Sequence, residues 1–168
     1  MRVLYFTRDY SPHDERFLSA LAQTAHEVFL LRMDPLQPVK LPAGITEVKF
    51  PEKKSAGSYP NPLDSRVAEL RTILDTVKPD VLHAGPLHGP AYIAAQTGFS
   101  PLVSMSWGAD ILHDGEVSQI DREKIQTTLY NSTLLIDDCQ AVTTRAVYGY
   151  GYPRTRIYRL PWGVDLEH

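Results

Sequence analysis

The chain has a single cysteine, little net charge and no long apolar run. Cys139 has no partner for an internal disulfide, and no Cys and His residues stand at zinc spacing, so neither a disulfide-stapled secreted fold nor a structural metal site is indicated. A net charge of -3 lacks the basic excess with which nucleic-acid-binding proteins neutralise phosphates, and nucleic acid is therefore not an expected partner. The first apolar run, Val3 to Phe6, is far too short for a signal sequence or a membrane span. We expect a cytoplasmic protein, and the sequence leaves a peripheral membrane contact open.

The composition is that of one globular domain: 168 residues, of which 43% are hydrophobic and 22% charged. Short, nearly continuous apolar runs recur along the chain, as expected for strands buried on both faces of a parallel sheet. These runs are Val3 to Phe6, Val28 to Leu31, Thr46 to Phe50, Val81 to His83, Leu102 to Met105, Thr133 to Ile136 and Ile157 to Leu160. Apolar residues at helical spacing lie between them. This alternation predicts an α/β fold with a mostly parallel sheet of about seven strands.

Ligands of parallel α/β sheets bind beyond the carboxyl ends of the strands, so the residues that follow each predicted strand are the site candidates. The first strand leads through residues 7–16 into a helix opened by Ser11 and Pro12, whose first-turn N–H groups can hold an anion. Here the candidates are His13, Asp14 and Arg16. Alternatively, Asp14 is a helix-start residue and Arg16 a solvated charge.

The fourth predicted strand is followed by a second cluster, in residues 83–90. Gly85 would let a ligand or another backbone approach closely, and His83 and His88 can act as neutral donors or proton carriers. The alternative is that His83 is a hydrogen-bonded histidine near the core and that Gly89 and Pro90 only start a helix.

Residues 104–114, after the fifth predicted strand, hold the densest cluster of aromatic, glycine, carboxylate and imidazole groups. Trp107 offers a flat face for a sugar or base, and Asp110 offers an acceptor for hydroxyl groups. Gly108 and His113 belong to the same cluster and are candidates with them. The structural alternative packs Trp107 in the core and uses Asp110 as the cap of the next turn.

A pair of carboxylates, Asp137 and Asp138, follows the sixth predicted strand. We expect one of them to cap a helix that begins near Cys139. No basic residue stands near Cys139 in the sequence to stabilise a thiolate, so we expect this thiol to be inert.

Four segments in this order and spacing carry a family resemblance: residues 11–18, 79–85, 105–112 and 160–165. With them the chain resembles the N-terminal domain of GT-B fold retaining glycosyltransferases, in the group known as glycosyltransferase family 4-like, group 1. The resemblance implies a three-layer Rossmann-like domain over residues 1–165, one half of a GT-B enzyme. It also implies that the segment from Pro161 to Asp165 crosses into a donor-binding domain. Leu166, Glu167 and His168 resemble the start of an expression tag.

By the same resemblance, the whole enzyme transfers a sugar from a nucleotide-diphosphate sugar to a cell-surface glycan, lipid or small-molecule acceptor. Most of the donor would be bound by the second domain, so the chain by itself is expected to be inactive. No cofactor and no metal are implied, because side chains and a helix dipole neutralise the diphosphate in this fold. The implied mechanism is a front-face displacement assisted by electrostatic stabilisation of the departing diphosphate.

The resemblance also implies roles for the candidate residues. His13, Asp14 and Arg16 would face the acceptor or the donor phosphate, although the glycine pair usual in that loop is missing here. Many relatives carry His-Gly-Ser-Asp where this chain has Trp107-Gly108-Ala109-Asp110, and their histidine contacts the transferred sugar. Trp107 cannot act as a base, so His113, His13 or His83 would have to substitute. Asp110 and His113 are therefore the expected catalytic residues.

Two other functions remain open from the sequence. One is a stand-alone α/β ligand-binding module whose ligand is never transformed. The other is half of a GT-B nucleotide-sugar epimerase, which would use carboxylates and histidines around the cleft as proton carriers.

Overall fold

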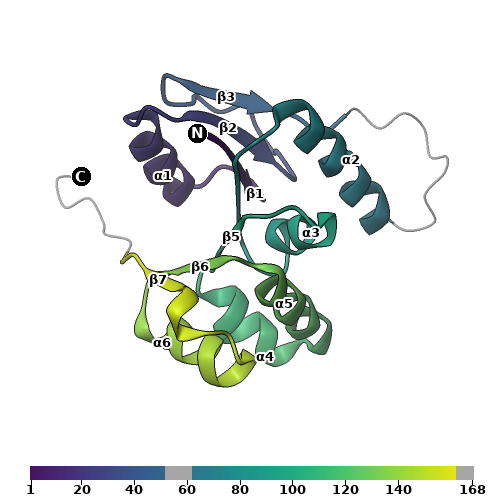
Figure 1. Ribbon diagram of the computed structural model, residues 1–168, viewed down its shortest axis with the longest axis vertical. Coiled ribbons are helices and arrows are strands. Elements are labelled where there is room, and N and C mark those ends of the chain that lie inside the picture. Colours follow the sequence, from purple (N-terminus) through teal and green to yellow (C-terminus); the bar gives the residue numbers. More distant parts are fainter. Residues whose placement is uncertain (52–61, 162–168) are drawn as a thin grey trace.

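The computed structural model of the protein describes residues 1–51 and 62–161. They form an α/β domain in which helices cover both faces of one sheet of seven parallel strands (Figure 1). The predicted Rossmann-like fold class is confirmed. Apart from Pro161, the predicted crossing at 161–165 and the tag-like residues 166–168 lie outside the described residues.

Each of the seven predicted apolar runs overlaps a strand. Their bounds are β1 Arg2–Thr7, β2 Glu27–Arg32, β3 Ile45–Val48, β4 Val81–Ala84, β5 Leu102–Met105, β6 Leu134–Asp137 and β7 Ile157–Arg159. The order across the sheet is β3-β2-β1-β4-β5-β6-β7. The chain therefore builds one side of the sheet outward from β1 and then returns to β4, beside β1, to build the other side. This reversal creates a switch point between the carboxyl ends of β1 and β4, where such sheets form a crevice.

The helices alternate with the strands, and two of them start where the sequence punctuation predicts. Ser11 caps the first helix ahead of Pro12, and Gly89 precedes the proline that opens the third. The α-helices are α1 Pro12–Ala22, α2 Pro62–Val77, α3 Pro90–Thr97, α4 Gly115–Val117, α5 Gln119–Asn131 and α6 Gln140–Thr144. A π-helical turn, η1 Asp110–Asp114, precedes α4, and a second, η2 Arg145–Gly149, follows α6. A 3-10 turn, η3 Arg154–Arg156, precedes β7.

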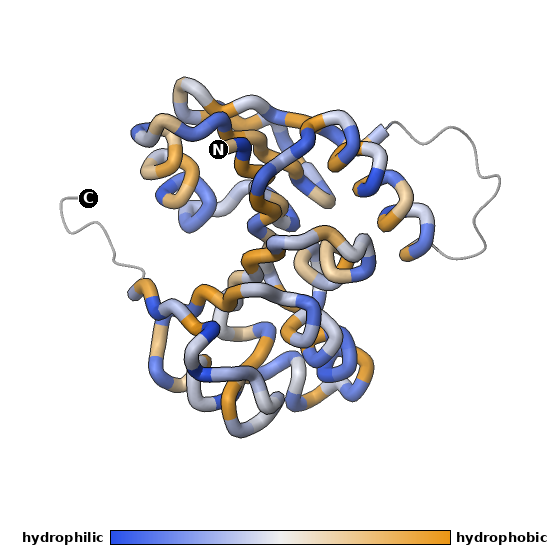
Figure 2. Tube along the Cα trace, in the orientation of Figure 1, coloured by the Kyte–Doolittle hydropathy of each residue, from blue (hydrophilic) through white to orange (hydrophobic). Residues whose placement is uncertain are grey.

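The core is split by the sheet because successive strand side chains point to opposite faces. Leu4 and Phe6 of β1 pack with α2 and α3 on one face, whereas Tyr5 packs with Leu18 of α1 on the other. A third cluster lies beneath α5 and α6. Figure 2 shows the hydrophobic residues along the strands in the middle of the molecule. In the described part of the chain, no helix is long and apolar enough to cross a membrane.

The prediction that Asp137 or Asp138 caps the helix after β6 is wrong. Helix α6 begins at Gln140, its N-cap residue is Cys139, and no side chain caps it. The Asp137 carboxylate is fully buried and instead accepts a hydrogen bond from Thr143 in α6, with Arg159 of β7 at 3.5 Å. Tertiary partners therefore take this carboxylate away from the helix end.

Truncating a buried strand residue should be costly. We expect Leu82→Ala in β4, where the side chain has no exposed surface, to lower the free energy of unfolding by about 3 kcal/mol, since both transfer energy and packing are lost. The same change at Leu36, which is 85% exposed, should cost less than about 0.5 kcal/mol. Urea unfolding followed by circular dichroism measures both. Equal effects would contradict the burial pattern.

Candidate functional site

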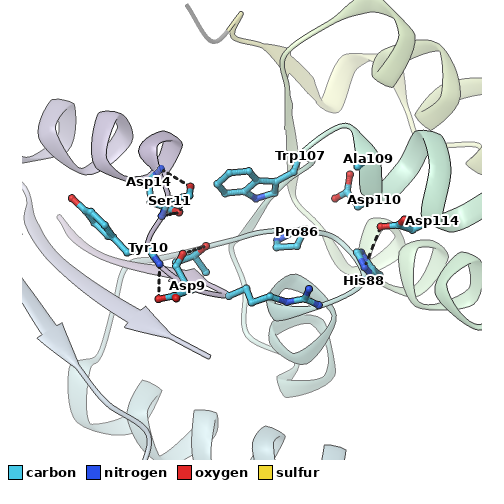
Figure 3. Close-up of a pocket in the computed structure, with 12 residues that line it drawn as sticks. Asp9, Tyr10, Ser11, Asp14, Pro86, His88, Trp107, Ala109, Asp110 and Asp114 are labelled. Atoms are coloured by element: carbon cyan, nitrogen blue, oxygen red, sulfur yellow. Dashed lines mark hydrogen bonds and ion pairs between the residues drawn. The ribbon is translucent and has the colours of Figure 1, made fainter. Parts of the chain in front are cut away.

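A pocket of about 350 Å³ opens at the switch point, beyond the carboxyl ends of β1, β4 and β5 (Figure 3). Three segments far apart in sequence meet there: the loop after β1 with the start of α1, the loop after β4, and the segment after β5. The lining residues are Thr7, Arg8, Asp9, Tyr10, Ser11, Asp14, Pro86, His88, Trp107, Ala109, Asp110 and Asp114. The structure thus brings together four of the predicted site residues, Asp14, His88, Trp107 and Asp110.

The Asp110 carboxylate lies 1% exposed at the back of the pocket and joins two strand ends. Its Oδ2 accepts the backbone N–H of Leu87 after β4 at 2.8 Å, and its Oδ1 accepts the Ser106 hydroxyl after β5 at 2.7 Å. The backbone N–H groups of Trp107 and Ile111 also donate to it. Burial raises the pKa of Asp110, and these hydrogen bonds offset only part of that effect. The Asp110 carboxylate is thus engaged in holding the two loops together. The geometry therefore favours an indirect role for Asp110, in which it positions other pocket residues and does not itself bind a ligand.

Trp107 forms one wall of the pocket, and its position depends on a glycine beneath it. A Cβ atom on Gly85 would lie 2.9 Å from the indole Nε1 and 2.7 Å from the Met105 carbonyl oxygen. Gly108 follows Trp107 with a φ of 83°, in the left-handed region that favours glycine. His13, at the start of α1, meets the indole edge-on at a centroid distance of 5.3 Å. His13 and both glycines therefore support the pocket without being among its lining residues.

Asp14 closes the start of α1 with its own charge. It forms a capping box in which its Oδ2 accepts the backbone N–H and the hydroxyl of Ser11 at 2.8 and 2.6 Å. Its Oδ1 accepts the Tyr5 hydroxyl at 2.9 Å, and burial together with the Asp14 charge raises the pKa of Tyr5 well above its ordinary value. The structure therefore shows Asp14 as a helix-start residue, which was the alternative to a ligand-binding role. Because a carboxylate already occupies this terminus, a phosphate there would meet like charge.

His83 lies in the core, as the structural alternative proposed, but among the described residues its buried Nε2 has no hydrogen-bond partner. It stands on β4 between the rings of Tyr5 and Phe17, at centroid distances of 4.9 and 6.1 Å, and is 8% exposed. Burial lowers its pKa to about 4, so the imidazole is neutral at neutral pH. It does not line the pocket.

His88 and His113 flank one carboxylate but differ in exposure. His88 Nε2 lies 3.5 Å from Asp114 Oδ2, and His113 Nδ1 lies 3.0 Å from Asp114 Oδ1. The His88 side chain is 15% exposed and lines the pocket, whereas that of His113 is 72% exposed and faces solvent. Arg16 is also exposed and lies outside the lining set. The catalytic role of His113 and the binding role of Arg16 stay predictions.

The sequence reasoning did not select four residues that shape the loop after β1: Arg8, Asp9, Tyr10 and Arg32. Arg32, at the end of β2, is 5% exposed and pairs with Asp9 at 3.0 Å and Glu47 at 2.6 Å. Desolvation acts to raise the pKa of Asp9, but hydrogen bonds from Tyr10, Arg32 and Leu36 lower it on balance. The strand-end rule, applied to β2 as it was to β1, would have found Arg32. Among residues 1–51 and 62–161, no three His, Cys, Asp or Glu side chains are placed to hold a metal ion.

A family model described as glycosyl transferase 4-like matches residues 2–139. The chain belongs to the glycosyl transferase 4-like family. The match runs from β1 through β6 and so contains every residue that lines the pocket. No curated protein significantly matches the sequence.

Solved structures share the fold of this glycosyl transferase 4-like chain. WaaG, a glycosyltransferase involved in lipopolysaccharide biosynthesis, matches 98% of the chain with a TM-score of 0.65 and 15% identity. Anabaena Alr3699/HepE in complex with UDP and glucose matches 99% with a TM-score of 0.64 and 15% identity. The UDP-GlcNAc 2-epimerase from Methanocaldococcus jannaschii matches 95% with a TM-score of 0.63 and 15% identity. The chain covers 46%, 46% and 45% of these three proteins, and at such identity the likeness shows the fold alone.

Removing the Arg32 guanidinium, which holds Asp9 in the loop after β1, should destabilise the domain. We expect Arg32→Met to lower the free energy of unfolding by about 3 kcal/mol, the low end for a broken buried ion pair, because Asp9 and Glu47 are partly exposed. Arg154→Met, on an exposed turn, is the matched control and should cost less than about 0.5 kcal/mol. Chemical denaturation of both variants checks this, and equal losses would show that the pairing is not stabilising.

His83 should make stability depend on pH. Its folded pKa of about 4 lies below the unfolded value of 6.5, so the unfolded state binds a proton first as the pH falls, and stability is lost between these values. From pH 7 to 4.5, we expect the wild type to lose about 2 kcal/mol more than His83→Gln, which cannot titrate. Urea unfolding at both pH values measures the difference, with His26→Gln as the histidine control. Parallel losses in the wild type and His83→Gln would refute the assignment.

Proposed function

We propose that this chain is the acceptor-side half of a retaining GT-B glycosyltransferase. The enzyme moves a sugar from a nucleoside-diphosphate sugar to a cell-surface glycan, lipid or small-molecule acceptor. The observation that carries the proposal is the pocket at the switch point, which lies wholly inside the segment matched by the glycosyl transferase 4-like model. Support for the donor class comes from HepE, a structural neighbour solved with UDP-glucose.

The chemistry of the lining residues suits a hydroxyl-rich ligand. Trp107 presents an indole, onto which the C–H face of a sugar ring can stack, whereas the ring of Tyr10 points away from Trp107 and packs on the core cluster of Tyr5 and Leu18 (Figure 3). The described pocket supplies one permanent cation, Arg8. Most of the diphosphate charge is therefore assigned in this proposal to a second domain, which the resemblance places after Pro161.

Asp110 serves this function as a positioning residue. By bonding to Leu87 and Ser106 it fixes the spacing between the His88 loop and the Trp107 wall. Rate in a transfer enzyme depends on such spacing, since a displacement of about 1 Å can cost about 100-fold. No cofactor or metal is part of the proposal, and we place the enzyme in the cytoplasm, at a membrane surface if its acceptor is a lipid.

An epimerase is the second candidate, and a specific observation favours it. UDP-GlcNAc 2-epimerases from three organisms share the fold, at TM-scores of 0.63, 0.63 and 0.56. The pocket also holds carboxylates and an imidazole of the kind that moves protons. An epimerase would convert its nucleotide sugar without an acceptor, whereas a transferase releases nucleoside diphosphate only as acceptor is consumed.

The full-length protein, which in this proposal carries a donor-binding domain after this chain, tests both functions. We expect acceptor-dependent release of nucleoside diphosphate from a nucleotide sugar, and a loss of about 100-fold in Asp110→Ala because the pocket wall shifts. Asp110→Asn, which keeps the side-chain size, should show the same direction of change in a folded protein, as checked by circular dichroism.

Asp75→Asn, an exposed carboxylate on α2, is the matched control and should keep the wild-type rate. Unchanged kinetics in Asp110→Ala would refute the role of this residue. Conversion of the nucleotide sugar without any acceptor would favour the epimerase, and binding with no turnover would favour a ligand-binding module.

A further inference from the structure

A second pocket, of about 470 Å³, borders the same helical turn, η1, as the pocket at the switch point. It opens between η1 and the segment after β6, which consists of α6 and η2. None of its lining residues lines the first pocket. They are Leu112, Ala141, Thr144, Arg145, Tyr148 and Gly149.

The exposed side of η1 joins the two pockets. Ala109, just before the turn, lines the first pocket, whereas Leu112 lines the second, and both residues are exposed. Asp110 and Asp114 of the same turn line the first pocket. Because a helix with its side chains is about 10 Å across, the width of one helical turn separates the two cavities. An elongated ligand can therefore occupy both pockets by passing over η1.

The lining of the second pocket combines an aromatic ring with a hydroxyl group. Tyr148 on η2 is 86% exposed, so its ring is open to a ligand and can stack on the C–H face of a sugar. The Thr144 hydroxyl accepts a hydrogen bond from the Gln140 side chain at 3.1 Å and can still donate its own proton. An acyl chain in this pocket would take water away from Thr144 and from the Arg145 guanidinium, which is unfavourable. The lining therefore suits a carbohydrate better than a lipid chain.

The second pocket also has an excess of positive charge. Arg145 Nη2 lies 2.9 Å from Glu116 Oε1, and Arg122 Nη2 lies 3.3 Å from the same oxygen. Two guanidinium groups thus share one carboxylate, and α6 and η2 contribute no acidic residue. Both arginine side chains are partly exposed, so a ligand carboxylate can reach them and form charge-assisted hydrogen bonds.

A glycine sets the position of the Arg145 side chain. A Cβ atom on Gly149 would lie 2.7 Å from Arg145 Cδ and 3.4 Å from its Nη1. The arginine side chain therefore lies across Gly149, where any larger residue would displace it. The guanidinium is held against the wall of the second pocket in this way.

We propose that the second pocket is an acceptor subsite that binds an acidic sugar unit. This inference rests on the proposed sugar transfer and narrows its acceptor to an acidic glycan that spans both pockets. The reacting unit lies in the first pocket, whose fixed acceptors suit neutral hydroxyl groups, and the acidic unit lies against Tyr148 and Arg145. The carboxylates of the first pocket and the arginines of the second then determine which end of the acceptor faces the donor.

Binding can be measured in this 168-residue chain, independently of any transfer. In proton–nitrogen NMR titrations, trigalacturonate should shift the backbone amide signals of Leu112, Arg145 and Tyr148. Maltotriose, a neutral trisaccharide of the same length, should bind at least about tenfold more weakly, because it has no carboxylate for the arginines. No shift with trigalacturonate, or equal affinity for the two trisaccharides, would overturn the proposal.

Substitutions test the contacts separately. Tyr148→Ala and Arg145→Gln should each raise the Kd for trigalacturonate about tenfold, since one removes the stacking surface and the other a charged donor. Gly149→Ala should also weaken binding, because the new Cβ displaces the Arg145 side chain. Tyr130→Ala, 84% exposed on α5, and Arg154→Gln, exposed on η3, are the matched controls and should bind as the wild type does. Equal losses in the controls would reveal non-specific attraction and refute the subsite.

The full-length protein separates this inference from the function on which it rests. If it transfers sugar to an acceptor, and Tyr148→Ala and Arg145→Gln leave KM for that acceptor unchanged, the subsite alone fails. If it transfers no sugar but the second pocket binds trigalacturonate, the proposed function fails and the acidic-sugar site remains. Hydroxyl-radical footprinting gives a further check: protection of Tyr148 in the unliganded full-length protein would mean that another domain covers the pocket, and the proposal would be wrong.

Discussion

The buried Asp110 carboxylate is the interaction on which the rest of the site depends. It gathers donors from the ends of β4 and β5, so two segments separated by about twenty residues behave as one rigid wall. Through Leu87 it fixes the loop that carries His88, and through Ser106 it fixes the turn that carries Trp107. Such a group cannot be exchanged without leaving several donors unsatisfied. One side chain therefore serves both the stability of the switch point and the geometry of the pocket.

The carboxylates around the pocket outnumber its cations, yet most of them are already engaged. Asp9 is held by Arg32, Asp14 by Ser11 and Tyr5, and Asp110 by its loops. The start of α1, a natural anion site in sheets of this kind, is closed by the Asp14 charge. The rest of the pocket lining is a set of fixed acceptors, the Trp107 indole and Arg8, which suits neutral hydroxyl groups better than a diphosphate.

The fold followed from the sequence because parallel strands buried on both faces leave nearly continuous apolar runs, and Ser-Pro and Gly-Pro pairs mark helix starts. The site followed only in part. The strand-end rule predicted that three segments converge: residues 7–16, 83–90 and 104–114. All the residues that line the pocket belong to these segments. Local sequence could not tell which polar groups are taken by tertiary partners: Tyr5 reaches Asp14, Thr143 reaches Asp137, and strand alternation sends His83 into the core while His88 enters the pocket.

Gly85 gives the site a further property. The indole of Trp107 rests on a spot where even one methyl group would collide with it and with the Met105 backbone. The width of the pocket is therefore set in part by Gly85, which lies outside the pocket lining. A Cβ atom at position 85 would displace the Trp107 indole while every lining side chain stayed the same. The range of ligand widths that such a domain accepts therefore depends on a residue beneath the pocket as well as on the residues that line it.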